Sequence, residues 1–364
     1  MAEPAARNER PNPDDFWLMY LNNWRRRQNI SSWDIKKQIA FSHCSKECFE
    51  LVKSLNQQPR ISIQLDGLES VTVNIGCETE RYIIKLVDEV NNNEGFPINF
   101  GLSARDAFIH LCEIYHHKEL TIHLNPESKT LLEATRNLFD GFPINTIVYT
   151  DGSNRRDEEA YIKNALELLL PSKTLLIAGS PYDSYSEFRN KVLKFEYETL
   201  TLQHPKQINL LDLKSIHTEI SIDTSPLEGR VALTTEHFQQ FIRKWIKSEI
   251  YPKFKTILIH SDARGIENNY QQNILDGLLY QQLPNNWKYK NKPKFTLWRM
   301  PSYVNGVFEV QREADGQKAV ISFESVGQAV LWKFCVDHTL PDVKLNSLSI
   351  QLIFRSIGQF FAKF

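Results

Sequence analysis

The sequence predicts an α/β fold in which short strands alternate with helices along most of the chain. Five apolar runs have the length and composition of buried strands: Leu120–Leu124, Ile144–Tyr149, Thr174–Ala178, Thr199–Leu202 and Thr256–His260. Between these runs, apolar residues recur at helical spacing in Ala104–Tyr115, Glu158–Leu170 and Thr234–Lys247. The first four runs begin roughly 25 to 30 residues apart, close to the period of leucine-rich repeats.

This spacing indicates how the units would pack. A strand with one returning helix cannot bury its own apolar face, so neighbouring units bury it for one another. The sequence therefore predicts a leucine-rich-repeat-like curved parallel βα array, beginning at about Leu102. An array of this kind offers a broad binding surface, which favours recognition of a partner over catalysis in a deep cleft.

The N-terminal part predicts a short helical module. Residues 1–15 are rich in proline and charge, and we expect a disordered lead without a signal peptide. Residues 16–58 then carry helical spacing in Trp33–Ala40 and Ser45–Leu55, with Ser45 as an N-cap. Pro59 ends the helical pattern.

From Arg60 the apolar period changes from helical to alternating. Ile61–Leu65 and Val71–Ile75 alternate apolar and polar residues, and Asp66–Gly67 between them is typical of a turn. Arg81–Val87 predicts a third strand. Later in the chain, Asn209–Ile216 predicts a short helix and His217–Ile222 another strand.

The C-terminal part predicts a small antiparallel meander that closes the array. Three alternating segments, FTLWRM, VFEVQR and AVISFES, follow Lys294, and Asn305–Gly306 and Asp315–Gly316 stand at their joints. The repeat domain would then span residues 59–325. Residues 326–364 form a C-terminal extension, with an additional helix near Gly327–Val336.

Composition excludes several functional classes. The 364 residues are 41% hydrophobic and 24% charged, and a net charge of −1 provides no general attraction to nucleic acid or anionic membranes. We therefore expect no nucleic-acid or membrane partner. The basic cluster Trp24–Arg27 is typical of a solvated helix surface. Five cysteines without a CxxC pair favour a reducing compartment.

No residue set predicts catalysis, cofactor binding or a metal site. The chain has no P-loop, GxGxxG, HExxH or GxSxG motif. We interpret His116–His117 as structural or solvated, and Cys44 and Cys48 as packing residues. Asp262 and Arg264 follow a strand, where α/β enzymes place catalytic groups. An enzyme site at the carboxyl ends of the strands, after Ile177 or Ile259, therefore stays an alternative to a non-enzymatic protein.

Several motifs resemble a known family. The segment FWLMYL, with WDIKKQIAFSHCSKECFELVKSLN after it, resembles the F-box of the large nematode F-box protein family. The later FIRKWIKS, KTILI and FEVQREADGQKAVISFE resemble its type-two F-box-associated domain. The resemblance runs from about Asp15 to Ser325, and the order of the motifs carries it.

This resemblance implies a substrate-recognition subunit of an SCF-type (Skp/cullin/F-box) ubiquitin ligase, in the cytoplasm or nucleus. The F-box would bind a Skp-type adaptor, and the array would bind an unknown target protein. Neither role needs a cofactor. The implied adaptor interface consists of apolar residues of the module: Phe16, Leu18, Met19, Leu21, Ile35, Ile39 and Phe41.

Three residues depart from the family pattern. Asn22 replaces a proline, and Arg25 and Arg26 occupy positions that are apolar in the family. Each lost aliphatic contact would cost on the order of 1.5–3 kcal/mol of adaptor binding. The alternative is therefore a protein-binding module with a decayed F-box and no ligase role.

Overall fold

The computed structural model describes most of the chain between residues 23 and 336. The described ranges are 23–66, 70–76, 81–86, 102–124, 138–149, 156–179, 181–182, 184–205, 207–213, 216–224, 233–250, 252–262, 269–284, 303–326 and 329–336. The chain divides into two compact units, Met1–Pro143 and Ile144–Phe364. None of the helices in these ranges is long and apolar enough to cross a lipid bilayer.

The first unit begins with three short helices, which we call the helical module: α1 (Asn23–Ser31), α2 (Ile35–Ser42) and α3 (Lys46–Lys53). Polar side chains start the last two helices. The Asp34 carboxylate accepts from the Lys37 backbone N–H at 2.8 Å, and the Ser45 hydroxyl accepts from the Cys48 N–H at 3.1 Å. The N-cap predicted at Ser45 is therefore confirmed.

A small apolar core holds this module together. Its fully buried side chains come from all three helices: Ile30, Ile35, Ile39, Cys48 and Val52. The buried Gln38 amide donates to the backbone oxygens of Ile30 and Trp33, at 3.2 and 3.0 Å. These bonds satisfy carbonyl groups where α1 passes into α2.

The described residues between 60 and 124 of the first unit form one helix and a mixed sheet. Its strands are β1 (Arg60–Asp66), β2 (Ser70–Gly76), β3 (Arg81–Leu86) and β4 (Leu120–Leu124), in the order β4-β1-β2-β3. Strands β1, β2 and β3 pair antiparallel, whereas β4 pairs parallel with β1 after the crossover helix α4 (Ala104–Ile114). The three strands predicted from Arg60 onward are confirmed as β1, β2 and β3.

The second unit contains a run of parallel strands in chain order. These are β5 (Ile144–Tyr149), β6 (Thr174–Ala178), β7 (Tyr197–Gln203), β8 (Ile216–Asp223) and β9 (Thr256–Asp262). Each pairs parallel with the next. The connecting elements are α6 (Arg156–Leu169), α7 (Tyr185–Lys191), the 3₁₀ turn η2 (Leu210–Asp212) and α8 (Thr235–Ile246). The predicted α/β alternation is therefore observed.

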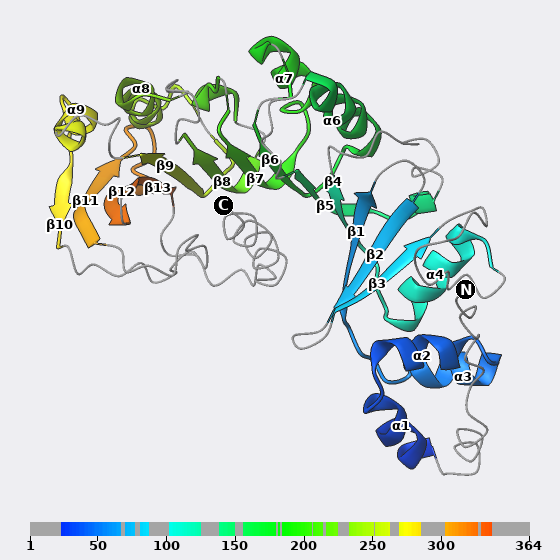
Figure 1. The fold of residues 1–364 in the computed structure, drawn as a ribbon. Coiled ribbons are helices and arrows are strands. Elements are labelled where there is room, and N and C mark those ends of the chain that lie inside the picture. The colour runs from blue at the N-terminus through cyan, green and yellow to red at the C-terminus, as the bar shows by residue number, and fades with distance from the viewer. Residues whose placement is uncertain are drawn as a thin grey trace, which may run out of the picture. The chain divides into compact units, whose positions relative to one another are not determined.

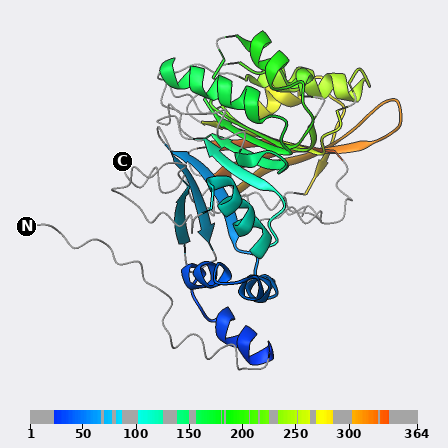
Figure 2. The ribbon, with the colours of Figure 1, turned by 90° about the vertical axis from the view of Figure 1, so that its right-hand side faces the viewer.

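The labelled α-helices of this unit lie on one side of its sheet (Figures 1 and 2). The apolar stripe of α8 shows what holds a helix there. Phe238 stacks on Trp332 with ring centroids 5.8 Å apart, and Phe241 meets the edge of Phe334 at 5.4 Å. The adjacent helix α9 (Tyr270–Leu275) adds Tyr270, 6.3 Å from Trp332. Burying these large rings supplies much of the packing energy on this side.

Antiparallel strands complete the second unit. They are β10 (Gln281–Leu283), β11 (Tyr303–Gln311), β12 (Lys318–Val326) and β13 (Ala329–Val336). Strand β13 lies between β12 and β9, so the order is β10-β11-β12-β13-β9-β8-β7-β6-β5. The helix predicted near Gly327–Val336 is wrong. Trp332 and Phe334 point to the helices while Lys333 and Cys335 are buried on the opposite face, and this two-sided burial hides the strand period.

The predicted antiparallel meander is observed, but only one of its two predicted turns is correct. Asp315–Gly316 lies in the turn between β11 and β12, as expected. Asn305–Gly306, in contrast, lies inside β11, where the register shifts between Val304 and Gly306. A β-bulge tolerates the same residues as a hairpin turn, so the dipeptide did not distinguish the two. The segment FTLWRM lies outside the described residues.

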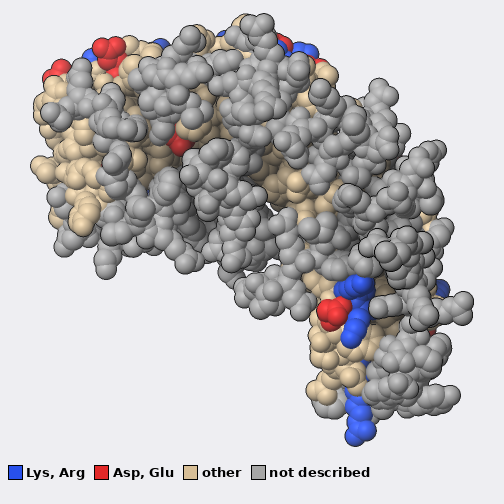
Figure 3. All heavy atoms as spheres, viewed as in Figure 1, with Lys and Arg blue, Asp and Glu red and all other residues tan. Residues whose placement is uncertain are grey.

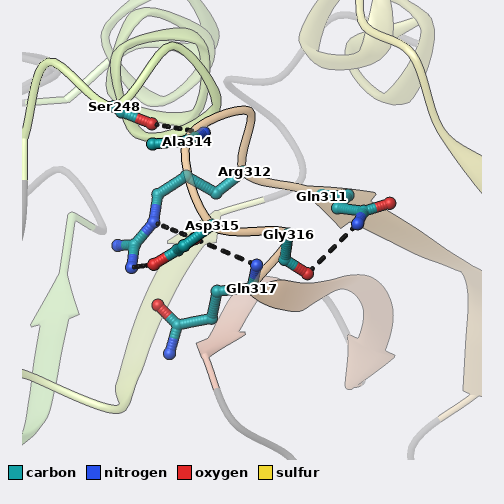
Figure 4. A network of polar contacts seen from close by, with 7 residues as sticks. All are labelled: Ser248, Gln311, Arg312, Ala314, Asp315, Gly316 and Gln317. Carbon is teal, nitrogen blue, oxygen red and sulfur yellow. Dashed lines mark hydrogen bonds and ion pairs between the residues drawn. The ribbon is translucent and has the colours of Figure 1, made fainter.

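The β11–β12 turn is fastened to the end of α8 (Figure 4). The Arg312 guanidinium donates from Nε to Asp315 Oδ1 at 2.9 Å and lies 5.3 Å from the Trp245 ring. The Ala314 N–H donates to the Ser248 hydroxyl at 3.1 Å, and the Glu313 N–H donates to the Ile246 carbonyl at 2.8 Å. Charge, stacking and backbone hydrogen bonds therefore fix this turn to one helix end.

Candidate binding surfaces

The structure describes only part of the predicted adaptor interface. Phe16, Leu18, Met19 and Leu21, together with Asn22, lie outside the described residues. Ile35 and Ile39 are 7% and 1% exposed, so both side chains belong to the core of the module. Phe41 is half-buried, and its ring meets the edge of Trp33 at 5.3 Å. Among the described members of the set, Phe41 alone retains surface that a partner can contact.

The arginines of α1 occupy different environments. Arg25 and Arg27 are exposed. Arg26 Nη1 lies 3.4 Å from Glu47 Oε1 of α3, and the Arg26 side chain is only 16% exposed. The guanidinium of Arg26 therefore reaches across to α3 with its stem partly covered, as long cationic side chains do at apolar surfaces.

The helical module is basic, although the whole chain is nearly neutral. Residues 23–56 contain seven lysines and arginines against three acidic residues. Basic side chains show on the module's face in Figure 3, with an acidic group beside them. A partner that binds this face would meet a positive potential, which increases the association rate with an acidic surface.

A histidine junction joins the module to α4, and the sequence pattern did not predict it. The rings of His43 and His110 stack with centroids 3.8 Å apart and an interplanar angle of 17°. Phe49 of α3 lies 5.0 Å from the same His110 ring. Residues 43 and 110 are far apart in sequence, so no local motif signals their contact.

His116 and His117 have structural roles at the end of α4, as predicted. His116 adopts a left-handed φ of 52°, and the His117 N–H donates to the Cys112 carbonyl at 2.8 Å. This is the hydrogen bond of a Schellman cap. His116 Nε2 also lies 2.8 Å from the Lys53 carbonyl oxygen, so it donates a proton to the end of α3.

The face of the second unit's sheet that points away from α8 is polar. The strand register places its side chains in three rows: Thr199, Glu219, Thr256 and Cys335; then Thr201, Ser221, Leu258, Lys333 and Ser322; then Gln203, Asp223, His260 and Leu331. We call this set the polar face. Most members are buried, including Glu219 at 6% and Lys333 at 4% exposure. Buried polar groups need partners, so this face is a candidate site.

Glu219 is the least satisfied group on the polar face. Among the described residues, no group donates a hydrogen bond to its Oε1 atom. Burial raises the pKa of Glu219 to about 7, although the Lys333 charge acts in the opposite direction. Glu219 is therefore partly protonated near neutral pH, and its carboxyl group can both donate and accept hydrogen bonds.

The neighbouring groups favour hydrogen bonding over nucleophilic chemistry. Burial raises the pKa of the Cys335 thiol, and Thr256 Oγ1 donates to its sulfur at 3.6 Å. A thiol that stays protonated is a poor nucleophile. Burial also lowers the pKa of His260, against the opposing effect of Asp223. The described polar face therefore presents hydroxyl, thiol, imidazole and carboxyl groups suited to hydrogen bonding, with Lys333 among them.

The remaining predicted chemistry is only partly placed. Asp262 ends β9, whereas Arg264 lies outside the described residues. In register, Asp223 and His260 lie side by side at the carboxyl ends of β8 and β9.

Within the described ranges, no three His, Cys, Asp or Glu side chains are arranged to hold a metal ion. Cys44 is exposed and Cys48 is buried, so these two thiols have different environments.

Comparison with known proteins identifies no relative. No family model, no curated protein and no solved structure matches this chain. The resemblance to nematode F-box proteins therefore stays a prediction from motif order.

Proposed function

We propose that this protein is a substrate-recognition subunit of an SCF-type ubiquitin ligase, acting in the cytoplasm or nucleus. The supporting observation is the chain order of strands β5 to β9, which pair parallel one after another. Their α-helices lie on one side of the sheet (Figure 1). We interpret this order as a leucine-rich-repeat-like βα array, and such arrays bind other proteins.

In this proposal the two parts of the protein have separate tasks. The helical module binds a Skp-type adaptor, and the array binds a target protein. Ubiquitin transfer takes place on another subunit, so this chain contributes by bringing the target close to the reaction. The role needs no catalytic group and no cofactor on this chain.

Exposed apolar side chains on the described surface offer a contact region for a target. Leu279 is 92% exposed and Tyr280 is 44% exposed, directly before the short strand β10. Large exposed apolar side chains at one place are typical of protein contacts. Because most of the polar face is buried, we expect the target to contact exposed side chains such as these, beside the antiparallel strands that continue the array's sheet beyond β9, and not the polar face itself.

Adaptor binding is the experiment that tests the ligase role. The full-length protein is titrated with a purified Skp-type adaptor by biolayer interferometry. We expect a dissociation constant of about 10 μM or tighter, which corresponds to roughly 7 kcal/mol. The control is Phe41→Ala, which removes the described surface ring of the predicted interface and should weaken binding. Absence of binding by a correctly folded wild type contradicts the ligase role.

The second candidate is a protein-binding module with a decayed F-box. The specific observation in its favour is that Arg25 and Arg27 of α1 are exposed, which places charge on the first helix of the module. The triple variant Asn22→Pro, Arg25→Val and Arg26→Leu restores the family residues. If this variant binds the adaptor and the wild type does not, the decayed-module function is correct.

A further inference from the structure

The junction between the helical module and α4 contains two stacked histidines in a polar and aromatic setting. His43 follows α2, and its ring lies 3.8 Å from that of His110 on α4. Ser42 Oγ lies 2.7 Å from His110 Nε2, and Phe49 packs on the same ring. His110 is therefore in contact with α2, α3 and the residue that links them.

The hydrogen bonds of Ser42 determine where His110 carries its proton. The Ser42 hydroxyl donates to the Ile39 carbonyl at 2.6 Å, so its oxygen is left to accept. His110 therefore donates from Nε2 to Ser42, and its neutral ring is unprotonated at Nδ1. A further proton on His110 must go to Nδ1, which creates an imidazolium ring stacked against His43.

We propose that this stack is a proton-operated latch: neutral His43 and His110 hold the helical module on α4, and protonation of both rings releases it. Two imidazolium rings at this separation repel each other, and a partly buried site screens the repulsion poorly. Once the helical module has moved away from α4, water can hydrate each charged ring. The latch is independent of the proposed ligase function, because it concerns a contact within the first unit.

The environment of the two rings supports this behaviour. Burial, with His110 as the second cause, lowers the pKa of His43 to about 4. Burial also lowers the pKa of His110, and the nearby Glu113 partly offsets this effect. The charged residues on the elements that pack here are Lys36 and Lys37 of α2, Lys46, Glu47, Glu50 and Lys53 of α3, and Arg105, Asp106 and Glu113 of α4.

A second histidine contact stays intact in acid and forms the hinge. His116 donates from Nε2 to the Lys53 carbonyl at 2.8 Å. A carbonyl oxygen only accepts, so this bond exists in the neutral ring and becomes stronger when the ring is charged. Acid therefore opens the stack at His110 while the end of α3 stays attached.

Four cysteines of the protein report on the latch in one experiment. Cys48 of α3 and Cys112 of α4 are buried in the first unit, Cys335 is buried in the second unit, and Cys44 is exposed. The full-length protein is treated between pH 7 and pH 4 with a pyridyl disulfide, which reacts with thiols in acid. Mass spectrometry quantifies each thiol on its own peptide, and Cys44 serves as the reference for reagent reactivity.

We expect labelling of Cys112 on α4, relative to Cys44, to rise about tenfold on acidification, the factor that one pKa unit represents. Cys48, in the core of the module, and Cys335, in the second unit, should stay protected. His43→Phe keeps an aromatic ring but cannot be charged, so it should suppress most of the rise. Glu113→Gln removes the carboxylate that favours a charged His110 and should move the midpoint to lower pH.

Three outcomes would overturn the latch. In the first, Cys112 stays protected in the wild type at pH 4. In the second, Cys48 or Cys335 becomes labelled together with Cys112, which means that acid unfolds the module or the whole protein. In the third, His43→Phe opens with the same pH dependence as the wild type. If His43→Phe does not fold, His43→Gln takes its place, with the same expectation and the same readout.

Discussion

At the residue scale, Glu219 is the clearest conflict between burial and charge. Its carboxyl group is 6% exposed, and Oε1 has no donor among the described residues. An unsatisfied buried acceptor costs about 1–3 kcal/mol. The protein reduces this cost by keeping the group protonated, since burial raises its pKa to about 7.

Replacing Glu219 with glutamine should stabilise the protein in neutral to alkaline solution. The unfolded carboxyl loses its proton near its ordinary pKa of 4.5, but the folded one keeps it up to about 7. The folded state therefore binds more protons between these values, and wild-type stability falls as the pH rises through this window. Above pH 7 we expect the free energy of unfolding of Glu219→Gln to exceed that of the wild type by about 1–2 kcal/mol.

Urea denaturation at pH 4 and pH 8 measures this difference. The advantage of Glu219→Gln should shrink at pH 4, where both proteins carry a neutral side chain. Glu198→Gln is the matched control, because it removes the same charge from an exposed position of β7. A Glu219→Gln variant that is less stable than the wild type at pH 8 would show that the carboxylate has a partner.

Ile39 tests whether a residue of the predicted interface is instead a core residue. With 1% exposure, Ile39→Ala should lower the free energy of unfolding by about 2–4 kcal/mol. Hydrogen exchange of the α2 and α3 backbone amides should accelerate accordingly. Lys37→Ala, an exposed change on the same helix, should leave that exchange unchanged. Equal effects of the two substitutions would contradict the packing described here.

At the element scale, the hairpin between β11 and β12 shows how a turn is tied to a helix. Hydrogen bonding to Arg312 holds the pKa of Asp315 at about 2, so the pair stays charged over most of the pH range. Ser248 adopts a left-handed φ of 61°, and the Glu249 N–H donates to the Lys244 carbonyl at 2.8 Å. This capped end of α8 places the Ser248 hydroxyl where the turn needs an acceptor.

Arg312→Lys should loosen this hairpin, because lysine lacks the planar fork that faces Asp315 and the ring contact with Trp245. We expect a lower free energy of unfolding than that of the wild type. The amides of Glu313 and Ala314, which bond to the end of α8, should exchange faster. Lys318→Gln is the control. The Lys318 side chain is 51% exposed, so its ion pair with Glu309 contributes little to stability. Unchanged exchange in Arg312→Lys would show that the backbone bonds alone hold the turn.

At the scale of the whole molecule, two titrations act on stability with opposite signs. His43 has a lowered pKa, so its unfolded form binds a proton first and stability increases as the pH rises from about 4 to 6.5. Glu219 has a raised pKa, so its contribution makes stability decrease as the pH rises from 4.5 to about 7. The two residues lie in different compact units. Partly cancelling contributions should give the wild type a shallow pH profile.

The two single variants should therefore reveal slopes that the wild type conceals. His43→Phe leaves the falling contribution of Glu219, whereas Glu219→Gln leaves the rising contribution of His43. The stability change of the double variant should equal the sum of the single changes, because sites that share no partner act independently. Thermal unfolding from pH 4 to pH 8 measures all four proteins. A double variant that departs from additivity would show that the two sites are coupled.

Local patterns predicted those elements whose two faces differ in polarity. Ser45 as an N-cap, the stripe of α8 and the alternation of Ile61–Leu65 each depend on neighbours in sequence, and each is observed. The helix predicted at Gly327–Val336 failed because β13 is buried on both faces. Asn305–Gly306 failed because bulges and turns accept the same residues.

Within the candidate sites, the contacts that matter are long-range. The stack of His43 on His110 and the row from Glu219 through Thr256 to Cys335 join residues that are distant in sequence. Their chemistry depends on which strands pair and how deeply each group is buried. A single sequence contains no local signal for either quantity.

The sequence by itself determined that this chain alternates strands and helices, because the periodicity of apolar residues depends only on their order along the chain. Only the tertiary structure decided that β13 enters the sheet between β12 and β9, and that Glu219 and Lys333 are buried together on one face. The physical reason is that hydrophobic burial and desolvation depend on which surfaces meet after folding, and that pairing is a property of the whole chain.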